Sequence, residues 1–209
     1  MALIMNETIP ASPAPEPISA FKRFLKSFWG EMLQIVVISL VIVIPFRLFI
    51  AQPFLVSGPS MDDTFANGEY LIVDELTYNF NDPQRGDVII FHYPLDTKKF
   101  FIKRIIGLPG ETVEIKNDKV IICLTNCQIE ANKIILTEPY IKIDKLEPPR
   151  PNTKVILKAD EYFVLGDNRS VSSDSRIWGP VKKDLISGRA FLRLLPFSRI
   201  GLFPGKITE

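Results

Sequence analysis

The chain has 209 residues, a formal net charge of +1, 23% charged residues and 46% hydrophobic residues. This length suits one domain of ordinary size with a short appended segment. Because the charge is almost balanced, no broad basic field is available to hold a nucleic-acid backbone, and we expect no nucleic-acid partner.

The chain holds one histidine, His92, and two cysteines, Cys123 and Cys127. A structural zinc site usually takes about four nitrogen or sulfur ligands and a catalytic site about three protein ligands, so this inventory predicts no metal site. His92 follows the apolar run VIIF and is interpreted as a strand-end residue, which disfavours a conventional serine triad built on it. The two cysteines are interpreted as a disulfide that closes a small loop, with two buried or free thiols as the alternative.

The N-terminal part divides into a polar segment and an apolar one. Residues 1–20 carry four prolines among small and polar residues and predict a disordered tail. Residues 21–51 begin with a basic cluster and continue as an apolar stretch from Met32 to Ala51, in which Arg47 is the only charge. As a helix this stretch would be about 30 Å long, the thickness of the hydrocarbon core of a bilayer. We therefore expect a transmembrane anchor rather than a buried core helix.

The charges around this stretch predict its orientation. Lys22, Arg23 and Lys26 precede it, whereas Arg47 is the only nearby positive charge at its other end. The positive-inside rule then places the N-terminus in the cytoplasm and residues 52–209 outside the cell membrane. A cleaved signal peptide is the alternative, but no small-x-small cleavage site follows the stretch.

The remaining residues have the pattern of a mainly β domain, barrel-like or a sandwich. Runs of β-branched and aromatic residues separated by turn signals predict strands at Glu69–Asp74, Asp87–Phe91 and Phe100–Ile106. Residues 112–122 predict a hairpin whose turn is formed by Asn117 and Asp118, since both residue types tolerate a positive φ.

Three short segments stand out as candidates for chemistry: VSGPSM at Val56–Met61, FIKRIIGLPGE at Phe101–Glu111 and GDNRSVSSDSR at Gly166–Arg176. Together with the expected anchor, GDVIIF at residues 86–91 and WGPV at residues 178–181, they resemble the type I signal peptidase family. Members of that family are Ser-Lys enzymes that remove signal peptides from exported proteins.

The resemblance implies that Ser60 is the nucleophile and Lys103 the general base. Lys103 lies in an apolar run, where partial desolvation would lower its pKa and make the neutral amine available. The backbone N–H of Ser60 would be one donor to the oxyanion. Taken alone, Ser60 would be a turn residue, and Lys103 would extend its stem along a sheet with its ammonium in water.

The third segment supplies the supporting residues that the resemblance implies. Ser172 would orient the amine of the lysine, and Asp174 and Arg176 would form an ion pair near the active site. Asp167 and Arg169 would support the same loop. Without the resemblance, these residues would be interpreted as a polar turn with solvated charges.

The family cleaves after small residues, with small side chains also favoured two positions earlier. Five residues match the apolar positions that line its substrate pockets: Phe54, Val56, Met61, Phe101 and Ile102. An extended substrate would add to a sheet edge, and the same apolar surface would rest on membrane lipid.

Three positions depart from the family pattern. Gly58 replaces a serine that some members use as a second oxyanion donor. Asp63 replaces a proline, and loss of that proline would loosen the turn after Ser60. If a folded wild type did not cleave, Asp63→Pro would be the first substitution to test. Phe65 replaces an aliphatic residue and would narrow the substrate pocket.

The leading hypothesis is a membrane-bound signal peptidase I that acts on preproteins through an acyl-enzyme, as a monomer and without a metal or cofactor. Whether it associates with the translocation channel is left open by the sequence. A soluble self-cleaving Ser-Lys repressor is a second hypothesis, which the apolar stretch and the GDNR segment disfavour. An inactive membrane-anchored peptide-binding module is a third, which only an activity measurement can dismiss.

Overall fold

The chain forms two compact units, Met1–Pro45 and Phe46–Glu209. The computed structural model describes residues 22, 27–49, 51–117, 119–124, 127, 129–141 and 152–207. The predicted tail at residues 1–20 and two members of the basic cluster, Arg23 and Lys26, lie outside the described residues.

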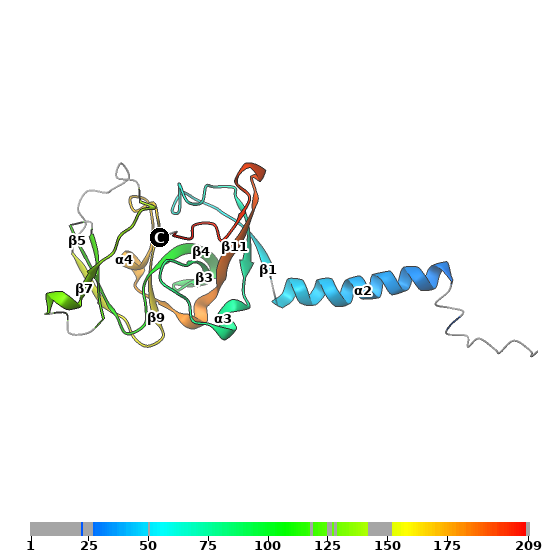
Figure 1. The fold of residues 1–209 in the computed structure, drawn as a ribbon, viewed down its shortest axis with the longest axis horizontal. Helices are drawn as coiled ribbons and strands as arrows, with labels where there is room; N and C mark the ends of the chain where they lie inside the picture. The colour runs from blue at the N-terminus through cyan, green and yellow to red at the C-terminus, as the bar shows by residue number, and fades with distance from the viewer. Residues whose placement is uncertain are drawn as a thin grey trace, which may run out of the picture. The chain divides into compact units, whose positions relative to one another are not determined.

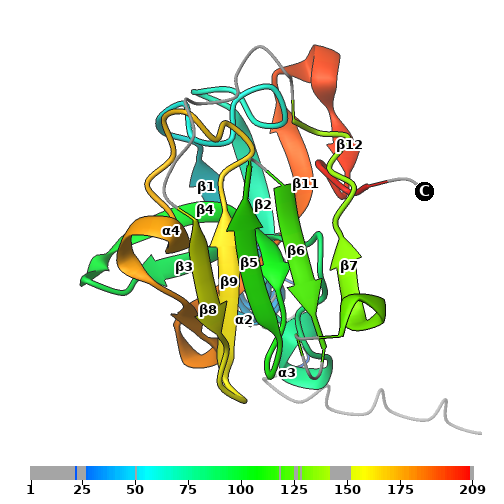
Figure 2. The ribbon, with the colours of Figure 1, turned by 90° about the vertical axis from the view of Figure 1, so that its left-hand side faces the viewer.

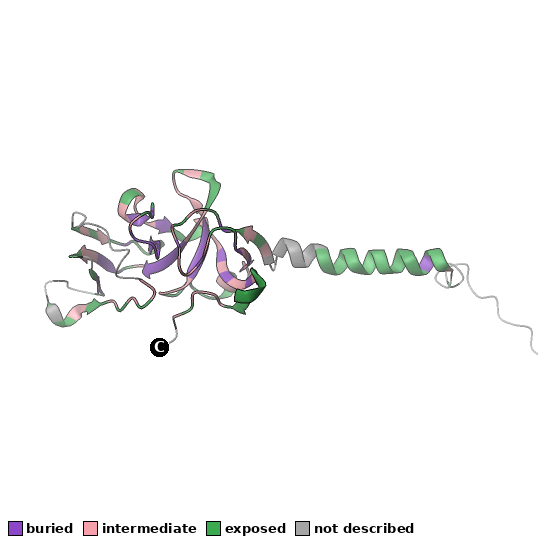
Figure 3. Ribbon diagram, turned by 90° about the horizontal axis from the view of Figure 1, so that it is seen from above, coloured by how far each residue is buried: buried purple, intermediate pink, exposed green. Residues whose placement is uncertain are grey.

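The first unit contains most of α2 (Phe28–Phe49), a 22-residue helix that overlaps the predicted apolar stretch and ends in the second unit. The large apolar side chains from Phe28 to Val43 are exposed, and Figure 3 shows almost this whole part of the helix in green. Within the described part of the chain, no helix combines the length and the hydropathy needed to cross a membrane. The transmembrane anchor therefore stays a prediction.

The second unit is mainly β, as the sequence predicted (Figure 1). Its strands are β1 (Ala51–Leu55), β2 (Tyr70–Asp74), β3 (Val88–Tyr93), β4 (Asp96–Gly107), β5 (Thr112–Lys116), β6 (Lys119–Cys123), β7 (Lys133–Ile135), β8 (Thr153–Ile156), β9 (Glu161–Leu165), β10 (Val181–Lys182), β11 (Ile186–Leu195) and β12 (Gly201–Leu202). Its short helices are α3 (Thr77–Phe80), α4 (Ser175–Trp178) and the 3-10 turns η1 (Glu130–Asn132), η3 (Lys183–Leu185) and η4 (Phe197–Arg199).

The strands form two antiparallel sheets. The larger has the order β1-β2-β11-β3-β4-β9-β10, with β12 paired to β11, so that β11 lies between β2 and β3. The smaller has the order β7-β6-β5-β8 and faces the viewer in Figure 2. The second unit is thus built from two sheets rather than from one closed barrel.

Strand alternation fills both faces of the large sheet. On β3, Ile90 belongs to a buried cluster with side chains of β2 and β11, whereas Ile89 belongs to another with side chains of β4 and β9. A third cluster joins the small sheet to the ends of β4 and β9. At Gly107 a Cβ atom would lie 2.4 Å from Val113 Cγ2, so a glycine is required where the two sheets approach.

The β5–β6 hairpin and the disulfide confirm two local predictions. Asn117 has a φ of 49°, the left-handed conformation expected in its turn, while Asp118 lies outside the described residues. Cys123 and Cys127 form a disulfide with a Cα separation of 5.6 Å.

Candidate active site

Ser60 lies in the loop that connects β1 to β2. The loop turns tightly, because the N–H of Asp62 donates to the carbonyl of Pro59 at 3.1 Å and the N–H of Phe65 to that of Met61 at 2.8 Å. Ser60 is half-buried and lines a cavity of about 450 Å³. Its hydroxyl is therefore held beside a cleft that can admit a peptide.

Lys103 lies on β4 and meets Ser60 from the other side of this cleft. Its Nζ is 2.8 Å from Ser60 Oγ and donates to the carbonyl of Ile102 at 2.9 Å. Only 3% of the lysine is exposed. A buried amine in hydrogen-bond contact with a hydroxyl has the geometry that a serine nucleophile and its base require.

The surroundings of Lys103 favour its neutral form. Burial lowers the pKa of Lys103 from 10.5 to about 8, and the nearby carboxylates of Asp174 and Asp167 partly oppose this shift. Desolvation dominates because the ammonium loses its water and gains no carboxylate in direct contact. A neutral amine is thus accessible at mildly alkaline pH and can accept a proton from Ser60.

Ser172 is also buried, at 2% exposure, but among the described residues its Oγ has no hydrogen-bond partner. The expected contact with Lys103 is absent, since the amine contacts Ser60 and the Ile102 carbonyl instead. Gly166 separates Ser172 from the nucleophile: a Cβ atom there would lie 2.2 Å from Ser172 Oγ and 2.5 Å from the Ser60 carbonyl oxygen. The loop that carries Gly166 therefore packs directly against Ser60.

Asp174 and Arg176 form the ion pair that the motif suggested. Arg176 Nε donates to Asp174 Oδ1 at 2.7 Å, and Nη2 to Oδ2 at 2.8 Å. Asp174 Oδ2 also accepts the N–H of Gly166 at 3.1 Å. This pair fixes the loop beside the nucleophile, where the N–H of Asn168 donates to the carbonyl of Ser60 at 3.1 Å.

Asp167 and Arg169, the two residues expected to support this loop, each form an ion pair with a residue outside it. Arg104 is fully buried, and its Nε and Nη2 donate to Asp167 at 2.9 and 2.6 Å. Arg169 pairs with Glu138. The sequence contained a signal for the first pair, since Arg104 follows Lys103 in the same strand and a buried guanidinium requires a carboxylate partner. The pairing with Glu138 had no local signal.

Four of the five predicted substrate contacts line the cavity beside Ser60: Phe54, Val56, Phe101 and Ile102. Met61 does not, because its side chain is fully buried in the core and its Sδ accepts the N–H of Asp167 at 3.4 Å. Phe65 is also fully buried in the same cluster. The prediction that Phe65 narrows the pocket is therefore wrong.

Asp63 corrects the expectation about the turn after Ser60. Its φ is 76°, whereas a proline ring fixes φ near about −65°. A proline at this position would therefore need a different backbone. Instead of being loose, the turn is held by long-range contacts, since Arg193 Nη2 donates to the carbonyl of Thr64 at 2.6 Å.

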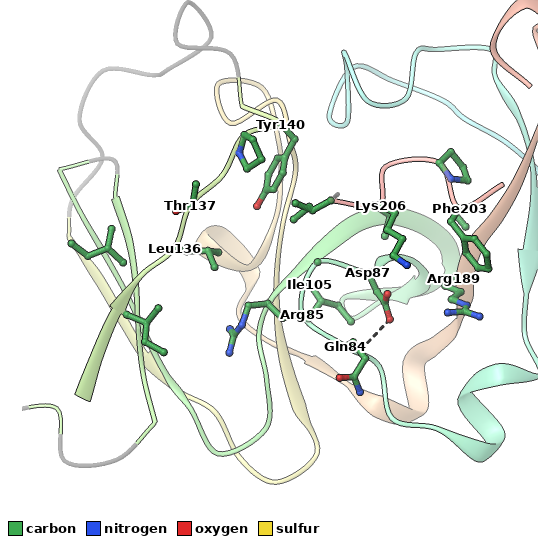
Figure 4. Close-up of a pocket in the computed structure, with 18 residues that line it drawn as sticks. Gln84, Arg85, Asp87, Ile105, Leu136, Thr137, Tyr140, Arg189, Phe203 and Lys206 are labelled. Atoms are coloured by element: carbon green, nitrogen blue, oxygen red, sulfur yellow. Dashed lines mark hydrogen bonds between the residues drawn. The ribbon is translucent and has the colours of Figure 1, made fainter. Parts of the chain in front are cut away.

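A second cavity of about 790 Å³ lies away from Ser60 and Lys103 (Figure 4). Its lining includes Tyr140, whose ring stacks on the Arg104 guanidinium with 4.0 Å between Cζ and the ring centroid. The cavity beside Ser60 is thus the smaller of the two, but it is the one that Ser60 and Lys103 line.

The signal peptidase model of peptidase family S26 matches residues 29–195. The chain belongs to this family. A probable signal peptidase I-1 from Synechocystis sp. is 36% identical over 91% of this chain and 90% of its own length. A signal peptidase I from Leptolyngbya laminosa is 36% identical over 93% of this chain and 91% of its own length.

Two further proteins are similar at slightly lower identity. Signal peptidase IB from Staphylococcus aureus is 32% identical over 80% of this chain and 90% of its own length. A solved signal peptidase I from Enterococcus faecalis is 33% identical and covers 52% of this chain and 97% of its own, with a TM-score of 0.43. The family model and the relatives from Synechocystis and Leptolyngbya show that the chain is a serine peptidase of the signal peptidase I type.

Proposed function

We propose that the chain removes signal peptides from exported preproteins by cutting after small-x-small sites, with Ser60 as nucleophile and Lys103 as general base. The observation that supports this most directly is the 2.8 Å contact between Lys103 Nζ and Ser60 Oγ inside a cleft. Without a buried amine at that distance, Ser60 would be an ordinary, weakly nucleophilic hydroxyl.

The proposed reaction begins with neutral Lys103. The amine accepts the proton of Ser60 as Oγ attacks the scissile carbonyl, and the N–H of Ser60 stabilises the oxyanion. The resulting ammonium donates its proton to the leaving amine, which departs and leaves an acyl ester on Ser60. Lys103 then accepts a proton from water as the water attacks the ester. The bond between Ser60 Oγ and the acyl carbon breaks, the acyl group leaves as a carboxylic acid, and Lys103 returns the proton to Ser60 Oγ.

Ser172 is proposed to orient the amine during this cycle. Its hydroxyl is buried and without a partner among the described residues, and a buried polar group in that state gains free energy from a new hydrogen bond. Rotation of a serine hydroxyl group needs no backbone change, so the ammonium formed in the reaction is a suitable partner. Asp174 and Arg176 would act indirectly, by fixing the loop.

The substrate is proposed to bind in extended form along β1. This strand is the terminal strand of the large sheet and contributes Phe54 to the cleft, opposite Phe101 and Ile102 of β4. An extended peptide beside a strand presents alternate side chains to one wall. The apolar lining of the cleft would then receive the side chains at the two small positions of a small-x-small site, which lie on the same side of an extended peptide.

Membrane attachment through residues 21–51, with the catalytic unit outside the cell, completes the proposal. The supporting observation is that α2 exposes apolar side chains on every face from Phe28 to Val43, whereas a helix that lies in water carries a polar face. The Cys123–Cys127 disulfide agrees with an oxidising compartment. Membrane fractionation and protease protection of intact cells test both parts: release by alkaline carbonate or a protected catalytic unit would reject this topology.

The activity itself is tested with the full chain purified in detergent, in the presence of chelator, and a preprotein bearing an Ala-x-Ala site. We expect cleavage at that junction by the wild type and none by Ser60→Ala or Lys103→Ala. Binding of the preprotein without cleavage by a folded wild type would favour the peptide-binding module instead.

A further inference from the structure

The turn that follows the nucleophile contains a backbone conformation that the chain must hold in place. Asp63, three residues after Ser60, has a φ of 76°. This left-handed region is unfavourable for a residue with a Cβ atom. Such conformations persist where surrounding contacts over-determine them, and they are concentrated at functional sites. The contacts that hold Asp63 therefore bear on the position of Ser60.

Arg199 supplies the contacts on the C-terminal side of Asp63. Its Nη2 donates to the carbonyl of Asp63 at 3.2 Å and to that of Thr64 at 3.3 Å. A guanidinium is always charged, and its two terminal nitrogens can serve different partners: here Nη2 contacts both carbonyls while Nη1 contacts Glu69. Arg199 lies in η4, more than 130 residues later in the chain, so no local rule links it to the nucleophile.

Glu69 fixes Arg199 in this position. Glu69 is buried at the end of the same loop, and its Oε1 contacts Arg199 Nη1 at 2.7 Å while its Oε2 contacts Arg193 Nε at 2.8 Å. The Arg199 side chain is 40% exposed, whereas that of Arg193 is only 8% exposed. Loss of Arg199 therefore leaves Glu69 paired with Arg193, and the fold keeps its buried ion pair.

The same turn is linked to the catalytic loop. Thr64 Oγ1 donates to Asp167 Oδ2 at 2.6 Å, and the N–H of the next residue, Asn168, donates to the Ser60 carbonyl at 3.1 Å. A displacement of Thr64 is therefore passed to Ser60 by two routes, along the turn and through the loop.

We propose that Arg199 is a positioning residue for the nucleophile: its guanidinium holds the Asp63 and Thr64 carbonyls and so keeps Ser60 Oγ within reach of Lys103. The inference rests on the proposed role of Ser60 as nucleophile. Arg199 is not among the residues that line the cleft, so its loss changes the chemical step rather than substrate binding.

Arg199→Ala is expected to lower kcat about tenfold to hundredfold, the effect of a small misplacement of a reacting group, with KM almost unchanged. Arg199→Lys keeps a positive charge for Glu69, but its single nitrogen cannot contact Glu69 and both carbonyls at once, so it should fold normally and still lose kcat. Lys183→Ala is the matched control, because Lys183 forms an exposed ion pair with Asp82. It should retain wild-type kcat.

A double-mutant cycle separates positioning from a general structural role. Glycine adopts a positive φ without steric penalty, so Arg199→Ala should cost less kcat in the Asp63→Gly background than in the wild type. Millimolar guanidinium should also restore part of the kcat of Arg199→Ala, because the site is partly exposed. Unchanged kcat in Arg199→Lys, or an equal loss in both backgrounds, would overturn the inference. An inactive wild type would instead reject the proposed function itself.

Discussion

The pKa of Lys103 makes the pH dependence of cleavage a direct test of the base. Burial lowers this pKa from 10.5 to about 8, so the neutral amine should make up about half of the enzyme at pH 8, about a tenth at pH 7 and about a hundredth at pH 6. We therefore expect kcat/KM to fall about tenfold per unit below pH 8 and to level off above it.

The assay is the initial rate of preprotein cleavage from pH 6 to pH 10 in one detergent, at substrate concentrations below KM. The substrate should carry no titratable side chain near the cleaved bond, so that the acid limb belongs to the enzyme. A rate that stays flat from pH 9 to pH 6, or one that still rises about tenfold per unit between pH 8 and pH 10, would refute the reasoning from burial.

The same pKa predicts a change in stability. Between the folded pKa of about 8 and the unfolded value of 10.5, the unfolded chain binds more protons at Lys103, so stability rises with pH across this window. Below pH 8 the ammonium destabilises the fold by about 3 kcal/mol. Lys103→Met should thus raise the free energy of unfolding at pH 7, although the loss of the hydrogen bonds made by the amine offsets part of this increase. The increase should vanish near pH 10.5. Urea unfolding at the two pH values measures it.

Substitutions at three positions test other parts of the site. Gly166→Ala should reduce kcat more than about hundredfold, because its Cβ atom would lie 2.5 Å from the Ser60 carbonyl oxygen. Unchanged kinetics would show that the loop backbone shifts to accommodate the Cβ atom without moving Ser60. Asp63→Pro should lower the melting temperature and kcat together, whereas Asp63→Gly should preserve both, since only glycine adopts a φ of 76° easily. Ser172→Ala should leave the fold as stable or more stable by up to about 1 kcal/mol in thermal unfolding, yet lower kcat; unchanged kcat would remove Ser172 from the proposed mechanism.

The sequence predicted the mainly β domain well because strand signals are local. Alternation and turn residues located β2, β3, β4 and the β5–β6 hairpin to within a few residues. The positions of Ser60 and Lys103, by contrast, were suggested by their resemblance to a family, because nothing in either local segment shows that the other will lie 2.8 Å away.

Long-range contacts account for what the sequence missed. Met61 looks like a pocket residue from its motif, but the loop carrying Asp167 covers it. Asp63 suggested a weakened turn after Ser60, yet Arg193 and Arg199, more than 120 residues later in the chain, hold the backbone carbonyls of this turn. Such partners are chosen by the fold as a whole, and local propensity carries no information about them.

The place of β11 in the large sheet has a consequence for biosynthesis. The β1–β2 pair carries the nucleophile loop and the β3–β4 pair carries the lysine, and β11 is the strand that joins the two pairs. Because β11 follows all four of these strands in the chain, Ser60 and Lys103 cannot be held together by the sheet until β11 has emerged from the ribosome. The topology therefore delays catalytic competence until β11 has been synthesised, and a shorter nascent chain beside other preproteins has no assembled site with which to cut them.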